Sequence, residues 1–177
     1  MVRHTAVDVP AGVCYGQADV DVAANFAEEA AAVRETLAGL EFDYAYSSPL
    51  RRCMMLARAC GYAEPAVDDR LMEIDFGDWE MRRWDDIVDP RLEEYYADYE
   101  HVAATGGESF DAQRSRVRAC LDEIADSVGR DARVVVFTHG GVIAAAMMCA
   151  MGLTAAESFA RQPRFGQMVT MEWTTAS

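Results

Sequence analysis

Two of the three histidines follow short apolar stretches and stand beside turn residues. His4 comes directly after Arg3, and His139 follows the β-branched run 134–138 and precedes a pair of glycines. An imidazole can act as a nucleophile or as a general acid or base near neutral pH. His139 could instead merely cap a helix in a structural turn, and Arg3-His4 could be a solvated terminus. The third histidine, His101, lies in an acidic region and is expected at the surface.

Two arginines could bring positive charge to these histidines. Arg3 adjoins His4, and Arg51 stands where a helix is expected to begin, after Ser-Ser-Pro at 47–49. A cation there opposes the helix dipole, which indicates an anionic partner, although a salt bridge to a neighbouring carboxylate is the simpler alternative. Two guanidinium groups and a helix N-terminus could hold a phosphoryl group in a fixed orientation. Their charge would also lower the pKa of an imidazole and keep it neutral and nucleophilic.

The segment from residue 134 to 151 must position His139. Its pattern predicts a buried strand at 134–137, a tight turn at 138–141 and a helix at 142–151 that is packed on all sides. A strand-turn-helix unit directs backbone N–H groups out of the carboxyl edge of a sheet, where anions bind in open α/β folds. Gly140 would let a ligand approach the backbone closely.

The other elements alternate along the chain. Periodicity and turn residues predict helices at 25–40, 50–60 and 110–128, and strands at 42–46 and 165–173. Residues 66–75 are expected to be short and extended, and 82–101 to form one or two short helices interrupted at Pro90. This order indicates an α/β three-layer sandwich with a mainly parallel sheet. We expect a single domain over residues 1–177, with an acidic helical cover over the sheet edge at about 80–108.

Composition narrows the classes of function. The chain has 51% hydrophobic and 26% charged residues, which is typical of a globular domain. Its net charge of −14 disfavours nucleic-acid and anionic-membrane partners, so a small anionic substrate would need a local concentration of arginines. The five cysteines and the acidic residues show no metal-ligand spacing, so we expect free thiols, no metal and no cofactor. The absence of a signal peptide or a long apolar run predicts a cytoplasmic protein.

Five segments together resemble one known family. Their order and spacing are similar to the motifs of the histidine phosphatase superfamily, which is also called phosphoglycerate mutase-like, and they extend over nearly the whole chain. Within that superfamily, Gly12 to Asp19 and Glu73 to Trp84 are most similar to the alpha-ribazole phosphatases of cobalamin biosynthesis. The five segments are Arg3-His-Thr5, Ser47-Ser-Pro-Leu-Arg51, Leu71-Met-Glu-Ile-Asp-Phe-Gly-Asp-Trp-Glu80, Gly106-Gly-Glu-Ser109 and Thr138-His-Gly-Gly141.

The resemblance implies a role for each matched residue. His4 would be the nucleophile that becomes phosphohistidine, and Glu73 would protonate the leaving group and then act as the base for water. Glu80 and Glu108 compete with Glu73 for that role, although the resemblance favours structural roles for both. The implied phosphate pocket consists of Arg3, Arg51 and His139 with Gly140, and Gln17 would line it.

The resemblance implies a phosphomonoesterase, with alpha-ribazole 5′-phosphate as the first choice of substrate. A broad-specificity small-molecule phosphatase is the main alternative, and aromatic residues at 15, 76, 79 and 84 would favour an apolar or aromatic ester, unless these rings only pack the cover onto the sheet. A phosphoglycerate mutase is disfavoured by the short chain. A catalytically silent binding module, or a structural domain with coincidental histidines, is disfavoured by the complete set of matched residues. Oligomeric state is left open.

Three departures from the family pattern stand out. Thr5 replaces a commoner glycine, and Met81 replaces a usual glycine. The segment before Arg3 is also shorter than in most members. Either the first strand is truncated or the true start lies further upstream, which would bear on stability more than on chemistry.

Overall fold

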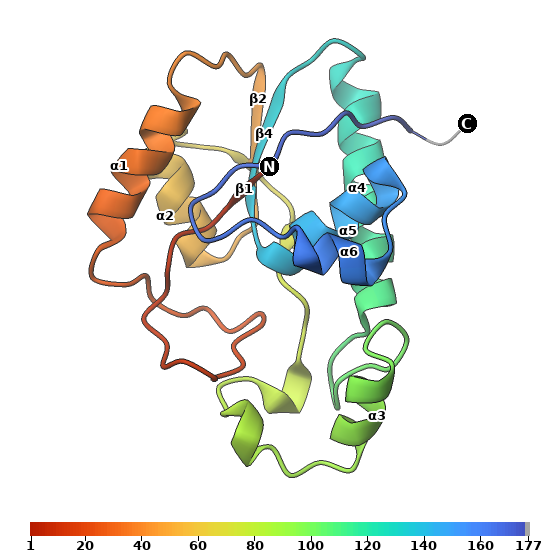
Figure 1. The fold of residues 1–177 in the computed structure, drawn as a ribbon. Coiled ribbons are helices and arrows are strands. Elements are labelled where there is room, and N and C mark those ends of the chain that lie inside the picture. Colours follow the sequence, from red (N-terminus) through yellow and green to blue (C-terminus); the bar gives the residue numbers. More distant parts are fainter. Residues whose placement is uncertain (176–177) are drawn as a thin grey trace.

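A parallel sheet forms the centre of the computed structural model, which describes residues 1–175. Within that range the sheet has four strands in the order β1-β4-β2-β3 (Figure 1). The pairing registers Val2 with Phe137 between β1 and β4, and Tyr44 with Val134 between β2 and β4. The strands are β1 (Val2–Arg3), β2 (Tyr44–Ser47), β3 (Ala66–Val67) and β4 (Val134–Thr138).

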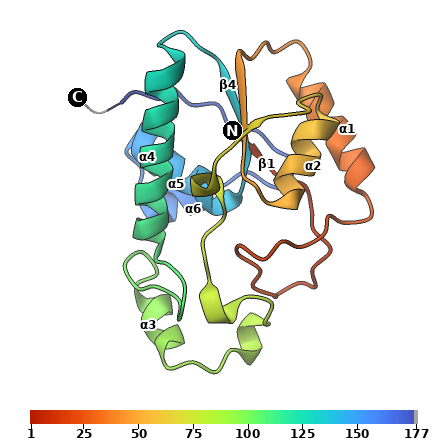
Figure 2. The ribbon, with the colours of Figure 1, turned by 180° about the vertical axis from the view of Figure 1, so that it is seen from behind.

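Helices cover both faces of the sheet, so the predicted three-layer α/β sandwich is confirmed. Helices α1 (Phe26–Leu37) and α2 (Arg51–Ala59) lie on one face, and α4 (Phe110–Val128), α5 (Gly140–Met151) and α6 (Ala155–Ala160) lie on the other (Figures 1 and 2). Each face has its own apolar core, one centred on α1 and α2 and the other on α4 and α5. A helix packed on all sides was predicted at 142–151; α5 instead begins at Gly140, inside the predicted turn, and its first eight residues are buried.

Residues 77–109 form a separate lobe beyond the carboxyl ends of the strands. Two short 3₁₀ helices (Gly77–Trp79 and Trp84–Asp86) and α3 (Arg91–Ala97) make up this cover, which lies at the lower end of Figure 1. Trp79 is fully buried in it, and its indole N–H donates to Asp89 Oδ2 at 2.7 Å. The prediction of short helices interrupted at Pro90 is confirmed.

The predicted strand at 165–173 is wrong, and one helix was not predicted. Residues 167–169 run antiparallel beside β1, with a single bridge between Val2 and Met168, because a two-residue strand cannot support a longer ladder. Helix α6 begins at a capping box, in which the Thr154 hydroxyl accepts from the Glu157 N–H and the Glu157 carboxylate accepts from the Thr154 N–H. That Thr-x-x-Glu spacing was the signal available in the sequence.

Met81 adopts a backbone conformation that normally belongs to glycine. Its φ is +62°, and its N–H donates to the Cys14 carbonyl, which ties the cover to the loop at 12–17. A left-handed conformation costs a side-chain-bearing residue about 1–2 kcal/mol. The glycine that is usual in the family would avoid this cost.

Among residues 1–175, no helix is both long and apolar enough to cross a bilayer.

Candidate active site

His4 directs one ring nitrogen away from its own backbone. Its side chain is 1% exposed, and Nδ1 lies 2.7 Å from the Thr5 carbonyl oxygen. A carbonyl oxygen only accepts, so Nδ1 carries the proton and Nε2 carries the lone pair. Burial, and then the charge of Arg52, lowers the pKa of His4 to about 3. The imidazole is therefore neutral near pH 7, and Nε2 can act as a nucleophile. Positive charge was the expected cause of this lowered pKa, but burial of the ring is the larger cause.

His139 holds the opposite tautomer beside it. The two rings lie 5.1 Å apart between centroids in an edge-to-face arrangement. Arg52 Nε donates to His139 Nδ1 at 3.3 Å, so the proton sits on Nε2, which donates to Ser48 Oγ at 2.8 Å. Burial and the charge of Arg52 lower the pKa of His139 well below its usual value. The carboxyl ends of β1, β2 and β4 therefore bring together two neutral histidines and one buried guanidinium.

The structure places Arg52 at the histidine pair, and not Arg51. The Arg52 side chain is 0% exposed and also donates to the carbonyls of Gly16 and Ala18, at 2.7 and 2.8 Å. These three contacts use three of its five N–H groups, which leaves donors for an anion. Arg51, in contrast, has a 49% exposed side chain and forms ion pairs with Asp19 and Asp21. The salt bridge that was considered as the simpler explanation for Arg51 is the one observed, so the expected position of Arg51 in the pocket is corrected.

Helical periodicity was the signal that could have separated the two arginines. Arg51 lies about two turns before the exposed Arg58 on the same face of α2, whereas Arg52 lies one turn before the buried Leu56. The buried residues of α2 are Arg52, Cys53, Leu56 and Ala57, which are spaced by three and four. Arg52 therefore belongs to the buried stripe, and Arg51 does not.

Replacing Arg52 with alanine is expected to weaken the binding of vanadate, a phosphoryl mimic, by about 2–5 kcal/mol, because a buried charge-assisted donor is lost. Arg51→Ala is the matched control and is expected to change binding by less than about 0.5 kcal/mol, since its charge is solvated and already paired. Titration calorimetry on both variants measures this, after circular dichroism has shown that each is folded. Equal weakening of vanadate binding in the two variants would show that Arg51 also binds the anion.

Glu73 lies at the N-terminus of α5. Its Oε2 accepts from the Gly141 N–H at 3.1 Å, and its Oε1 accepts from the Ile74 N–H at 2.9 Å and from Gln113 Nε2 at 3.1 Å. A Cβ atom on Gly141 would overlap Glu73 Oε1, so only glycine allows this approach. The helix N-terminus that was expected to bind a ligand thus already holds a carboxylate of the chain itself. An acid or base there is bonded to the backbone two residues after His139.

Three further predicted residues lie around this centre. Arg3 Nη1 donates to Gln162 Oε1 at 3.1 Å and to the Pro163 carbonyl at 2.8 Å, and its guanidinium stacks on Phe165. Gly140 begins α5 directly after His139 and is buried. Gln17 instead donates to the Glu73 carbonyl at 3.0 Å and lines a recess behind the Glu73 backbone. Gln17 therefore contacts the Glu73 backbone, and it does not line the pocket beside the Glu73 side chain.

The two competing carboxylates are engaged elsewhere. Glu80 Oε1 accepts from the backbone N–H groups of Gln17 and Phe76, at 2.7 and 3.2 Å. Glu108 forms an ion pair with Arg116 at 2.6 Å and accepts from the Asp75 N–H. Both carboxylates hold loops together, as the resemblance suggested. Among the described residues, no group of three or more His, Cys, Asp or Glu could hold a metal ion.

A pocket of about 240 Å³ opens beside Glu73, between the sheet edge and the cover. Glu73, Gln113 and Gly141 form part of its wall. Trp79 does not line it, and its packing inside the cover is the alternative that was considered for this ring. The aromatic lining comes from the loops, the cover and helices α4 and α6, and it includes Tyr15, Phe76, Trp84, Tyr95, Tyr99, Phe110 and Phe159.

Comparison with known proteins agrees with this geometry. The family description "Histidine phosphatase superfamily (branch 1)" matches residues 1–176. An adenosylcobalamin/alpha-ribazole phosphatase from Escherichia coli K12 is 29% identical over 163 residues, which cover 88% of this chain and 79% of the relative. A glucosyl-3-phosphoglycerate phosphatase from Mycolicibacterium vanbaalenii is 33% identical over 165 residues, which cover 86% and 73%. The crystal structure of a putative alpha-ribazole-5′-P phosphatase from E. coli superposes with a TM-score of 0.84 at 25% identity, covering 93% and 84%.

The fold and the family match together define the class of protein. The parallel sheet with a helical layer on each face, together with the TM-score of 0.84 to the E. coli structure, defines a phosphoglycerate mutase-like α/β fold. The chain belongs to the histidine phosphatase superfamily and is a phosphoric monoester hydrolase.

Proposed function

We propose that the chain hydrolyses phosphate monoesters through a phosphohistidine on His4. The observation that carries this proposal is the tautomer of His4, since a buried, neutral imidazole directs its Nε2 lone pair away from the Thr5 carbonyl. Arg52 and Arg3 place guanidinium groups near that ring, and Glu73 stands at the adjacent helix terminus. A nucleophile, a cationic pocket and a carboxylate are the groups that this reaction requires.

The reaction proceeds in two transfers. His4 Nε2 attacks phosphorus, so that a P–N bond forms and the P–O bond to the alcohol breaks, while protonated Glu73 gives its proton to the leaving oxygen. Water then attacks the phosphohistidine, ionised Glu73 takes a proton from it, and the P–N bond breaks to restore His4. Arg3, Arg52 and His139 stabilise the charge on the transferred group throughout.

The substrate that we propose is alpha-ribazole 5′-phosphate, a sugar phosphate that carries an aromatic heterocycle. The aromatic lining of the pocket beside Glu73 supports this choice, because rings such as Trp84 and Tyr95 stack on flat heterocycles. A broad-specificity phosphatase is the alternative. It is favoured by the similar identity to a relative named for glucosyl-3-phosphoglycerate, a substrate without an aromatic ring.

A panel of phosphate esters, assayed in EDTA, tests the substrate. We expect kcat/KM for alpha-ribazole phosphate to exceed that for glycerol phosphate by about 10- to 100-fold, the equivalent of stacking one heterocycle. Tyr95→Leu should reduce this preference, whereas Tyr96→Leu, which changes an exposed neighbour, should not. Equal rates across the panel would favour the broad-specificity alternative. Activity that is lost in EDTA and restored by magnesium would contradict the proposed arginine-based chemistry.

A further inference from the structure

Gln113 is a polar residue on the apolar face of α4. The buried residues of this helix are Phe110, Gln113, Val117, Cys120, Leu121 and Ile124, and the Gln113 side chain is 0% exposed. Burying an amide among apolar residues costs free energy unless its hydrogen bonds are satisfied. Its Nε2 donates to Glu73 Oε1 at 3.1 Å, whereas its Oε1 is buried without a partner among the described residues. A side chain with that cost calls for an explanation beyond packing.

The unpartnered oxygen suits the two protonation states of Glu73. An ionised carboxylate only accepts, so the amide must present its N–H₂ group, as it does here. A protonated carboxyl can donate, and rotation of the amide by 180° about its last torsion would present Oε1 as the acceptor. Gln113 can therefore remain bonded to Glu73 in both states.

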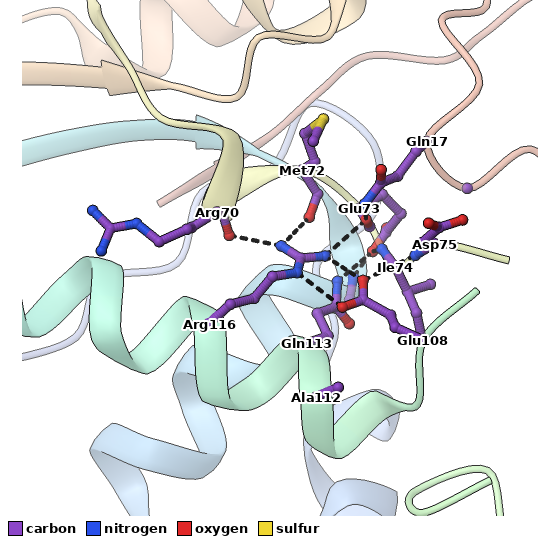
Figure 3. Close-up of polar contacts among 12 residues, drawn as sticks. Gln17, Arg70, Met72, Glu73, Ile74, Asp75, Glu108, Ala112, Gln113 and Arg116 are labelled. Carbon is purple, nitrogen blue, oxygen red and sulfur yellow. Dashed lines mark hydrogen bonds and ion pairs between the residues drawn. The ribbon is translucent and has the colours of Figure 1, made fainter. Parts of the chain in front are cut away.

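Arg116 holds the backbone of the same segment from one turn further along α4. It donates to the carbonyls of Arg70, Met72 and Glu73, at 2.7, 2.8 and 2.9 Å, and its charge is neutralised by Glu108 (Figure 3). The Arg116 guanidinium thus holds three backbone carbonyls of the segment that ends at Glu73, while Gln113 holds the Glu73 carboxylate (Figure 3). Both contacts come from one rigid, 19-residue helix.

We propose that Gln113 and Arg116 are positioning residues that act through Glu73. The inference rests on the proposed role of Glu73 as acid and base. The carboxyl must reach first the leaving oxygen and then a water, and a displacement of about 1 Å in such a group can cost about 100-fold in rate. Neither residue needs to touch the substrate for this effect.

Leaving-group dependence distinguishes positioning from general damage. Gln113→Leu and Arg116→Lys should slow the turnover of an alkyl phosphate by about 10- to 100-fold, because its alkoxide needs the proton from Glu73. The rate of the p-nitrophenol burst from p-nitrophenyl phosphate should stay within about 3-fold of the wild-type rate, since nitrophenolate leaves without that proton. Val117→Ala is the control: it loosens the same buried face of α4 and should lower stability while leaving the ratio between the two esters unchanged.

A double-mutant cycle completes the test. In a Glu73→Gln background, Gln113→Leu should slow the turnover of the alkyl phosphate by less than about 2-fold further. The carboxyl group through which Gln113 acts is already missing from that background. Losses that multiply in the double variant, or a Gln113→Leu that slows the burst of p-nitrophenol as much as the turnover of the alkyl phosphate, would overturn the inference. If Glu73→Gln alone leaves turnover unchanged, the proposed acid–base role fails as well. If it slows turnover while Gln113→Leu and Arg116→Lys do not, only the positioning inference fails.

Discussion

His4→Asn is expected to reduce the turnover of every phosphate ester by about 10⁴-fold or more. Asparagine can keep the hydrogen bond to the Thr5 carbonyl, because its amide nitrogen occupies nearly the place of Nδ1. It has no atom in the place of Nε2, so no P–N bond can form. Losing the nucleophile of such a site removes almost all catalysis beyond what binding and charge stabilisation provide. Steady-state assays with p-nitrophenyl phosphate measure the loss.

The chain offers a matched control for this change. His101 is exposed and paired with Asp98, so His101→Asn should leave turnover unchanged. Acid quenching during turnover of a ³²P-labelled ester should trap acid-labile label on the wild-type protein and none on the His4 variant. Label that persists in His4→Asn would assign the nucleophile to another residue, and turnover above about a tenth of the wild-type rate would reject the phosphohistidine mechanism.

Glu73→Gln is expected to separate the two half-reactions by leaving group. Glutamine can still accept the Gly141 N–H but can neither donate an acidic proton nor take one from water. With p-nitrophenyl phosphate, the variant should give a burst of nitrophenol and accumulate phosphohistidine, because nitrophenolate leaves unaided and only the attack of water is slowed. With an alkyl phosphate it should give neither. The affected steps should slow by about 10²–10⁴-fold, the usual contribution of a positioned acid or base.

Rapid-quench kinetics with both esters measures this difference. Glu80→Gln is the appropriate control, since that carboxylate also accepts two backbone N–H groups but holds a loop. The Glu80→Gln variant should change the rates with the two esters by the same factor. A leaving-group effect in Glu80→Gln and none in Glu73→Gln would exchange their roles. Unchanged turnover in both variants would place the acid elsewhere.

Local sequence signals determined most of the secondary structure. The period of apolar residues in Phe110–Val128 predicted α4 with the bounds that the structure gives. The run of β-branched residues before Thr138 predicted β4, and the apolar run at 142–151 predicted most of α5, although the two glycines after His139 belong to the helix and not to a turn. These signals are reliable because each depends on residues within one or two turns of the chain. The spacing of five short segments likewise determined the family.

Strand pairing and side-chain contacts that depend on a distant part of the chain could not be predicted from local patterns. Whether residues 165–173 form a strand depends on the length of β1, which lies more than 150 residues away, and only a bridge forms. Arg51 and Arg52 are the same residue type side by side. Their roles differ because one faces the buried sheet edge and the other faces Asp19 and Asp21.

The chemistry of the site was likewise predicted in part from the sequence and decided in part by the tertiary structure. The sequence by itself indicated that two histidines would follow strands at one edge of a parallel sheet, and the family resemblance added Glu73. Only the tertiary structure decided the tautomer of His139, because Arg52 and Ser48, from a distant segment, contact its two ring nitrogens. Only the tertiary structure brought Gln113 against Glu73, across 40 residues of chain. The physical reason is that strand and helix periods are local properties, whereas burial, tautomer and hydrogen-bond partner are set by whichever distant segment packs against the residue.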